Sequence, residues 1–234
     1  MTPLEQQQTR LIEPAAHTFW HRVRFDIVVA QAHDAKADTV LDIGAGSGML
    51  GDHLQTDDSL EYRFDESSPV LDGHLAQHFG GTARFGPDER VGTDTVCAML
   101  DVIEHIEDDV SALTAWRERM DPGARLVVTA PAIQWLFSSW DTELGHFRRY
   151  SRPSLRAALT AAGFQVHRSD YLFPELLPIV VKRKFVGAHS DDVDMPQLSH
   201  RVNRLGHRVS TASARCRRFW PAGTSVVAVA EPAR

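Results

Sequence analysis

Short apolar runs alternate along the chain with segments in which apolar residues recur at helical spacing. The apolar runs predict strands at residues 39–43, 60–65, 82–85, 94–100, 125–130, 164–169 and 225–230. The helical spacing predicts helices between them, including 15–32, 68–79, 109–120 and 152–162. Because strands and helices alternate, we expect an α/β fold with an open, mostly parallel sheet and helices on both of its faces.

The first predicted strand leads through Asp42 into a turn with Gly44, Gly46 and Gly48. Glycines allow the backbone to turn sharply and to approach a ligand closely. A helix begins after the turn, and its free N–H groups face the same crevice. Counting from Gly46 through Gly51 gives a dinucleotide fingerprint, but this pattern begins two residues too late after the strand. A carboxylate at Asp42 repels a pyrophosphate and attracts an ammonium or sulfonium, so the turn favours a ligand with a cationic amino-acid end.

Three stretches resemble motifs of the class I S-adenosylmethionine-dependent methyltransferases. Leu41–Gly48 resembles their first motif, a strand with an acidic residue followed by G-x-G-x-G. The D-x-x-E-H stretch at 101–105 resembles a second signature. The G-H-x-R-R-Y-S run at 145–151 resembles one branch whose members often act on small molecules, lipid carriers or sugar-linked intermediates. The resemblance implies a Rossmann-like sheet of seven strands, with the last strand inserted antiparallel between the fifth and sixth, and S-adenosyl-L-methionine as the cofactor.

The resemblance also implies where the cofactor binds. Asp42 and the glycine turn hold its amino-acid end, and Asp65, about twenty residues after Gly44, meets the ribose hydroxyls. Asp88 is the residue expected near the adenine, and the loop after the fourth strand lies beneath the sulfonium. The predicted cofactor-binding residues are Asp42, Gly44, Ala45, Gly46, Gly48, Asp65, Glu66, Asp88, Leu100 and Asp101.

Two histidines are candidates for a catalytic base, because an imidazole titrates near neutral pH. His105 follows the fourth strand, and His146 lies in the long aromatic segment 135–150, which we expect to form a wall or lid over the methyl group. His105 has an alternative role in holding its loop through a backbone hydrogen bond. The predicted substrate-binding residues are Trp135, Trp140, Arg148, Arg149 and Tyr150. Each of the two arginines has an alternative role in binding backbone carbonyls.

A divalent metal ion is a further alternative for the D-x-x-E-H stretch. Asp101, Glu104 and His105 offer oxygen and nitrogen donors at positions i, i+3 and i+4. We assign no metal site from the sequence alone.

The chain divides into three parts in this interpretation. Residues 1–36 form an N-terminal helical segment, residues 37–170 and 223–234 form the Rossmann-like domain, and residues 171–222 form a cap. The cap carries a Lys-Arg-Lys cluster at 182–184 and an apolar stripe at Leu198, Val202, Leu205 and Val209. We expect the stripe to cover the core; a dimer contact and an anionic surface are the alternatives.

Composition narrows the function further. The chain has 234 residues and a formal net charge of −6, which argues against general nucleic-acid binding. Two cysteines are too few for a disulfide framework, and no apolar run approaches the roughly 18 residues of a membrane span. We expect a cytoplasmic methyltransferase, a monomer or homodimer, that methylates O, N or C of a small molecule, with weak membrane-surface or lipid-linked contact as an option. The alternatives are an NAD(P)-dependent oxidoreductase and a non-catalytic methyltransferase-like subunit.

Overall fold

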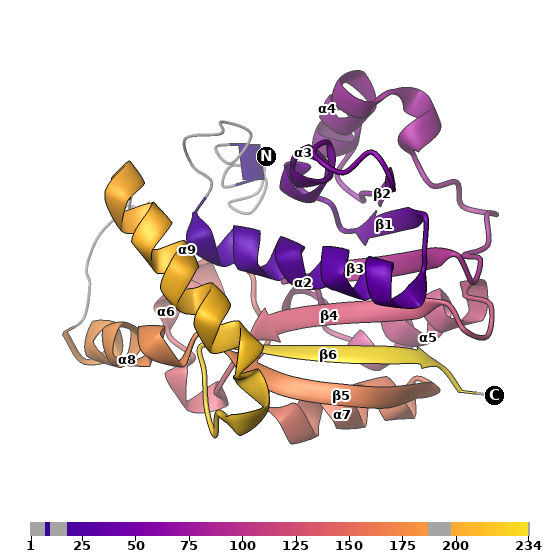
Figure 1. Cartoon of the computed structure of the whole chain (residues 1–234). Helices are drawn as coiled ribbons and strands as arrows, with labels where there is room; N and C mark the ends of the chain where they lie inside the picture. Colours follow the sequence, from indigo (N-terminus) through magenta and orange to yellow (C-terminus); the bar gives the residue numbers. More distant parts are fainter. Residues whose placement is uncertain (1–7, 10–17, 187–197, 234) are drawn as a thin grey trace.

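A mixed sheet forms the centre of the computed structural model, which describes residues 8–9, 18–186 and 198–233 (Figure 1). In these residues the sheet has six strands in the order β2-β1-β3-β4-β6-β5. The strands are β1 (Thr39–Ile43), β2 (Glu61–Asp65), β3 (Thr95–Leu100), β4 (Arg125–Pro131), β5 (Phe164–Leu172) and β6 (Ser225–Pro232). The expected α/β Rossmann-like class is confirmed.

The prediction of a seventh strand at residues 82–85 is wrong. This stretch begins as a short 3₁₀ turn, Gly81–Ala83, and only Arg84 forms a bridge, to Phe64 in β2. The turn leaves too few extended residues to build a ladder of hydrogen bonds. The prediction that the last strand inserts antiparallel is confirmed, because β6 pairs antiparallel with both β4 and β5.

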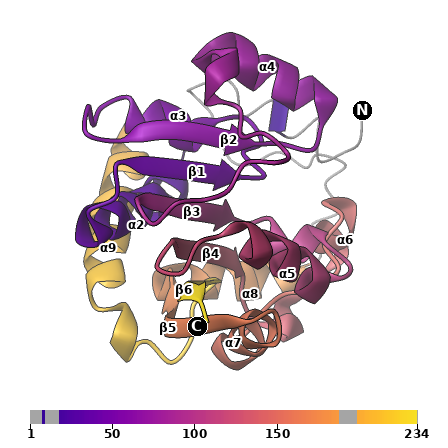
Figure 2. The same cartoon turned by 90° about the vertical axis from the view of Figure 1, so that its right-hand side faces the viewer.

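Helices cover both faces of the sheet (Figure 2). They are α2 (Phe19–Ala35), α3 (Met49–Leu54), α4 (Pro69–Phe79), α5 (Asp109–Arg119), α6 (Ser139–Glu143), α7 (Arg152–Ala161), α8 (Leu177–Val186) and α9 (His200–Arg215). Helices α2 and α9 lie on one face, and α5 and α7 lie on the other. None of the helices within the described ranges is long and apolar enough to cross a bilayer.

Successive side chains of the central strands point to opposite faces of the sheet and contribute to two apolar cores, one on each face. In β1, Val40 belongs to the same core as Ile27 of α2, whereas Leu41 belongs to the core that contains Leu113 of α5 and Leu155 of α7. Because β1 pairs with β2 on one side and β3 on the other, the chain reverses its direction of winding at β1. A doubly wound sheet has its ligand crevice beyond the carboxyl ends of the strands at this point.

Helix α9 packs on α2 through small residues, and its apolar stripe faces away from the core. A Cβ at Gly206 would lie 2.5 Å from Phe19 Cδ1, so only glycine allows this close approach. The stripe residues Val202, Leu205 and Val209 are 51%, 63% and 46% exposed. The prediction that the stripe covers the core is therefore wrong, because the complementary face of α9 is the one with small side chains.

Candidate functional site

A cavity of about 220 Å³ lies at the carboxyl ends of β1 and β3. The glycine turn lines one side, the residues after β3 line another, and α2 and the segment after β4 complete the wall. The predicted site residues that line it are Asp42, Gly44, Ala45, Gly46, Leu100, Asp101, His105 and His146. The fold thus brings together predicted residues that lie far apart in the sequence, from Asp42 to His146.

Hydrogen bonds connect the turn between β1 and α3 to the end of β2 and the residue that follows it. Gly44 has a φ of +69°, and a Cβ there would lie 2.8 Å from Val102 Cγ2, so a larger residue does not fit. The N–H of Gly44 donates to the carbonyl oxygen of Asp65 at 2.8 Å. The N–H of Gly46 donates to Glu66 Oε2 at 2.7 Å. These hydrogen bonds fix the glycine turn, whose residues Gly44, Ala45 and Gly46 line the cavity.

Asp42 is a buried carboxylate in the cavity wall. It is 4% exposed, and the Tyr62 hydroxyl donates to Asp42 Oδ2 at 3.1 Å. Burial raises the pKa of Asp42 to about 7, with the Tyr62 hydrogen bond acting against this and the charge of Glu66 adding to it. Within the described residues, no Lys or Arg forms an ion pair with Asp42. A cationic ligand group in the cavity would supply the missing charge.

The remaining predicted cofactor residues do not line the cavity. Gly48 begins α3 with a φ of +81°, and Glu66 holds the turn through Gly46 and the N–H of Ser68. The Asp65 carboxyl is half-buried, and burial raises its pKa against the opposing charge of Arg119. Asp88 is exposed in a surface turn.

The residues after β3 are fixed by a buried arginine. Arg24 of α2 is 8% exposed, and its Nη2 lies 2.9 Å from Asp101 Oδ2. Arg24 also donates to Ser225 Oγ at 2.9 Å. Asp101 has a φ of +55°, which is held by hydrogen bonds from its N–H to the Thr129 carbonyl and from Thr129 Oγ1 to its carboxylate, both 3.0 Å. This contact network sets the position of the cavity floor.

Sequence reasoning missed Arg24 and its neighbour His21 as wall residues. The helical spacing of α2 contains the signal. Arg24 lies three and four residues before the buried Ile27 and Val28, and His21 lies three residues before Arg24, so both share the inward face. Gln8 was missed too: its Oε1 accepts from the N–H of Ser47 at 3.2 Å. Nothing in the local sequence around Gln8 indicates this contact.

Glu104, His105 and His146 line the cavity together, and we call them the acceptor-side wall after the role that the sequence predicts for the two histidines. The two imidazole rings have centroids 4.6 Å apart in an edge-to-face arrangement. Burial, aided by the neighbouring His146, lowers the pKa of His105 to about 4, so His105 is neutral at physiological pH. Glu104 is 0% exposed, and burial together with the charge of Asp101 raises the pKa of its carboxyl well above the ordinary range.

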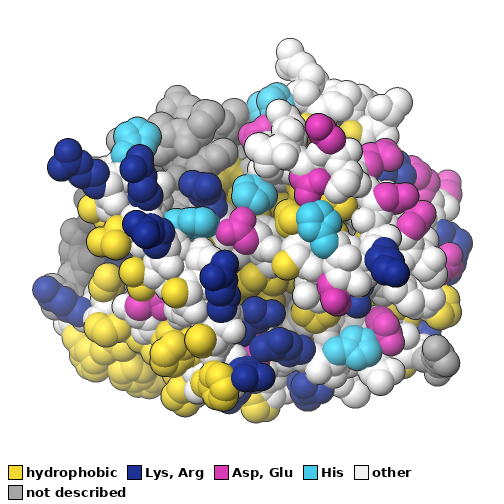
Figure 3. Space-filling model, viewed as in Figure 1, with side chains coloured by type: hydrophobic (Ala, Val, Ile, Leu, Met, Phe, Trp, Pro, Cys, Tyr) yellow, Lys and Arg dark blue, Asp and Glu magenta, His cyan; other side chains and the backbone are white. Residues whose placement is uncertain are grey.

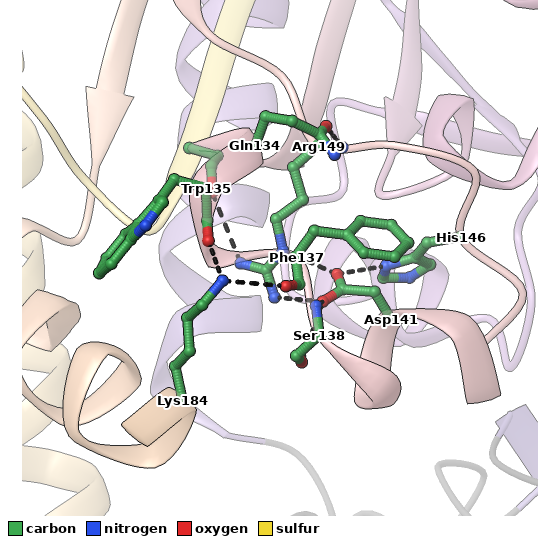
Figure 4. A network of polar contacts seen from close by, with 9 residues as sticks. Gln134, Trp135, Phe137, Ser138, Asp141, His146, Arg149 and Lys184 are labelled. Atoms are coloured by element: carbon green, nitrogen blue, oxygen red, sulfur yellow. Dashed lines mark hydrogen bonds and ion pairs between the residues drawn. The ribbon is translucent and has the colours of Figure 1, made fainter. Parts of the chain in front are cut away.

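Asp141 organises the segment between β4 and α7 (Figure 4). Its buried carboxylate accepts from Arg149 Nε at 2.7 Å, Arg149 Nη2 at 2.9 Å and the N–H of Ser138 at 2.9 Å. His146 Nδ1 lies 3.0 Å from Asp141 Oδ1. Although burial acts to raise it, these hydrogen bonds lower the pKa of Asp141 to about 2. Asp141 therefore fixes the orientation of the His146 ring.

The predicted substrate-binding residues have partners inside the protein and do not line the cavity. Arg148 pairs with Asp109 at 2.9 Å, and the Tyr150 hydroxyl donates to the same carboxylate at 2.6 Å. Trp135 and Trp140 lie against α8, where Lys184 and Arg183 stack over their rings. Lys184 also donates to the carbonyl of Trp135 (Figure 4). In this structure, the aromatic segment is tied to α8 and to its own acidic residues.

A family model described as a methyltransferase domain matches residues 16–169 of the chain. No curated protein matches significantly. Among solved structures, the chain is similar to S-adenosylmethionine-dependent methyltransferases from Clostridium acetobutylicum (9% identity, 91% of this chain and 92% of that chain covered, TM-score 0.53) and Archaeoglobus fulgidus (15%, 88% and 94%, TM-score 0.51). It is also similar to phosphoethanolamine N-methyltransferase 2 of Haemonchus contortus in complex with S-adenosyl-L-methionine (13%, 85% and 49%, TM-score 0.52).

These likenesses between structures concern the fold, because the sequence identities are low. The family match is direct, since it covers more than half of the chain and includes the glycine turn, the acceptor-side wall and Asp141. The chain therefore belongs to the methyltransferase domain family and has the class I Rossmann-like fold of that group.

Proposed function

We propose that this protein transfers the methyl group of S-adenosyl-L-methionine to an O, N or C atom of a small molecule. The observation that carries the proposal is Asp42: a buried carboxylate that no basic side chain in the described residues neutralises, at the edge of a glycine turn that lines the cavity. The ammonium of the cofactor's amino-acid end is the complement of such a group. Membership of the methyltransferase family supports the same cofactor.

Different residues of the cavity would bind different parts of the cofactor. Asp42 and the backbone at Gly44–Gly46 would bind the amino-acid end, and Leu100 and Asp101 would form the floor that Arg24 holds in place. Bound S-adenosylmethionine supplies an already activated methyl group. The protein therefore has to exclude water and align the acceptor atom about 3 Å from the methyl carbon.

His105 and His146 both line the cavity, so each would lie close to an acceptor bound there. With a pKa of about 4, His105 is neutral but a weak base. The Nδ1 of His146 contacts Asp141, which leaves the Nε2 of His146 available to the acceptor. The geometry supports a role for both imidazoles on the acceptor side, and His146 is the better oriented of the two.

Direct titrations test the cofactor. We expect isothermal titration of the purified full chain with S-adenosylmethionine to show one site, with no heat of binding for NADH or NADPH, because Asp42 repels a pyrophosphate. Binding of a nicotinamide cofactor instead would overturn the proposal. A protein that binds neither S-adenosylmethionine nor a nicotinamide cofactor would favour the alternative of a non-catalytic methyltransferase-like subunit.

The affinity for S-adenosylmethionine should depend on pH through Asp42. Only the ionised carboxylate attracts the ammonium, and with a pKa of about 7 the ionised fraction rises from about 0.1 at pH 6 to about 0.9 at pH 8. We expect the dissociation constant to be several-fold lower at pH 8 than at pH 6, and less than the full tenfold because the cofactor's own amino group loses part of its charge near pH 8. Calorimetry at both values checks this, and tighter binding at the lower pH would contradict it.

An exposed apolar and basic face favours a lipid-linked acceptor within the small-molecule class. The face consists of Trp135, Ile179, Phe185, Val202, Leu205 and Val209. Figure 3 shows hydrophobic side chains gathered over α8 and beside α9, with Lys and Arg side chains around them. No Asp or Glu occurs from residue 198 to 230, although the chain as a whole has a net charge of −6. Apolar side chains bordered by positive charge suit the surface of an anionic bilayer.

We expect the full chain to co-sediment with anionic phospholipid vesicles at low salt and to remain in solution with zwitterionic ones. Leu205→Glu combined with Phe185→Glu should reduce vesicle binding at least tenfold, because both side chains are more than 60% exposed on this face. Val70→Glu, at an exposed position on α4, is the matched control. The alternative outcome is that the protein does not bind vesicles but forms a concentration-dependent dimer, which the same double substitution dissociates. That result would assign the face to a homodimer contact instead.

A further inference from the structure

Glu104 has a buried carboxylate that the rest of the fold does not satisfy. The side chain is completely buried, and no other residue in the described part of the chain donates a hydrogen bond to either of its oxygens. A buried polar group without a hydrogen-bond partner is destabilising whether or not it is ionised, unless something binds it. The main-chain carbonyl of Glu104 accepts from the N–H of Phe147, so this residue also joins the two segments that form the acceptor-side wall.

Two imidazoles lie beside this carboxylate. One carboxylate oxygen of Glu104 and one ring nitrogen each of His105 and His146 lie within 4.8 Å of one another. Ligands bound to a common ion at about 2.1 Å are about 3–4 Å apart, so small side-chain rotations bring these atoms to coordination distance. Asp101 is not a member of this group and is instead paired with Arg24.

The second contact of His146 matches that of a metal ligand. Its Nδ1 is bound to the Asp141 carboxylate, which leaves Nε2 for the cluster. Histidines that bind metals usually direct their other ring nitrogen to a carboxylate or a carbonyl, which fixes the ring and raises its basicity. Arg149 in turn holds Asp141 with two hydrogen bonds.

We propose that Glu104, His105 and His146 bind one divalent ion of zinc or a first-row transition metal at the acceptor end of the cavity. One carboxylate and two imidazoles form a donor set that these ions prefer over magnesium and calcium. Three protein ligands leave open coordination positions on the cavity side, where an oxygen or nitrogen of the acceptor binds. The imidazoles then serve as ligands rather than as free bases. The role toward the acceptor rests on the proposed function, whereas the binding of the ion does not.

The test titrates the chelator-treated full chain with ZnCl₂ and, separately, with MnCl₂, using calorimetry and the electron paramagnetic resonance signal of manganese. We expect one site, and we expect Glu104→Gln and His146→Gln each to weaken zinc binding about 100-fold or more. Both variants replace a donor with a side chain of similar volume, and circular dichroism checks that they fold.

His78 supplies the matched control. It pairs with Asp52 on the surface and stacks on His74, so these groups are another place where zinc can collect. His78→Ala should leave the cavity site intact. Binding that His78→Ala removes and Glu104→Gln does not, or no binding at all, overturns the inference. S-adenosylmethionine binding without any metal site would refute only this inference, whereas metal binding without S-adenosylmethionine binding would refute only the proposed function.

Discussion

Asp42→Asn is expected to raise the dissociation constant for S-adenosylmethionine about 100-fold or more, which corresponds to about 2.7 kcal/mol. The substitution keeps the shape of the side chain and its hydrogen bond from Tyr62, and it removes only the charge. Asp42 is 4% exposed, so water screens its attraction for an ammonium poorly. Isothermal titration of the variant at pH 8, where the wild-type carboxylate is mostly ionised, gives the largest contrast.

A measurement of thermal stability distinguishes a loss of cofactor affinity in Asp42→Asn from misfolding of the variant. The pKa of Asp42 is about 7 in the folded chain and near 4 when unfolded, so the unfolded state loses its proton first and stability falls as the pH rises between these values. At pH 8 the Asp42→Asn protein without cofactor is therefore expected to melt at the same temperature as wild type or higher. Asp38→Asn, an exposed position just before β1, is the control for the charge change. Unchanged affinity in Asp42→Asn would remove the basis of the proposed function.

The central fold could be predicted from the sequence because its strands have a strong local signal. Buried parallel strands form continuous apolar runs, and β1, β3 and β4 are buried along nearly their whole length. The stretch at 82–85 was assigned to a strand by the same rule. It failed because four residues after two glycines carry too little information to distinguish a single bridge from a strand.

The site was predictable where it depends on strand ends. Asp42, Leu100 and Asp101 end adjacent parallel strands, and such ends necessarily meet at one edge of the sheet. Partners of charged side chains in long loops are set by tertiary contacts, which no local pattern encodes. For this reason the sequence left open whether Arg148 and Arg149 bind substrate, and the structure pairs them with Asp109 and Asp141.

The exposed stripe of α9 shows the limit of periodicity. A helical pattern of apolar residues identifies one face of a helix, but it does not say what that face contacts. Packing against α2 was decided by Gly206, which allows the two helices to approach closely at Phe19. The apolar face of α9 therefore remained outside, next to Arg201, Arg204 and Arg208.

Asp141→Ala is expected to lower the free energy of unfolding by about 3–5 kcal/mol, the usual cost of removing one member of a buried ion pair. The substitution leaves the guanidinium of Arg149, whose side chain is 11% exposed, without its two charged hydrogen bonds, and it also removes the cap on the N–H of Ser138. Urea unfolding monitored by tryptophan fluorescence measures the loss. Glu143→Ala, at an exposed position on the same short helix, should change stability by less than about 0.5 kcal/mol.

A second substitution distinguishes the buried charge from a general packing defect. In Asp141→Ala combined with Arg149→Met, the unpaired guanidinium is gone, so part of the lost stability should return. The orientation of His146 would not return, because its Nδ1 still lacks the Asp141 carboxylate. We therefore expect the double variant to fold more stably than Asp141→Ala but to keep a deficit of about 10-fold to 100-fold in methyl transfer or in zinc affinity. If restored stability also restored activity, Asp141 would act only as a structural anchor for the segment, and its role in positioning His146 would be excluded.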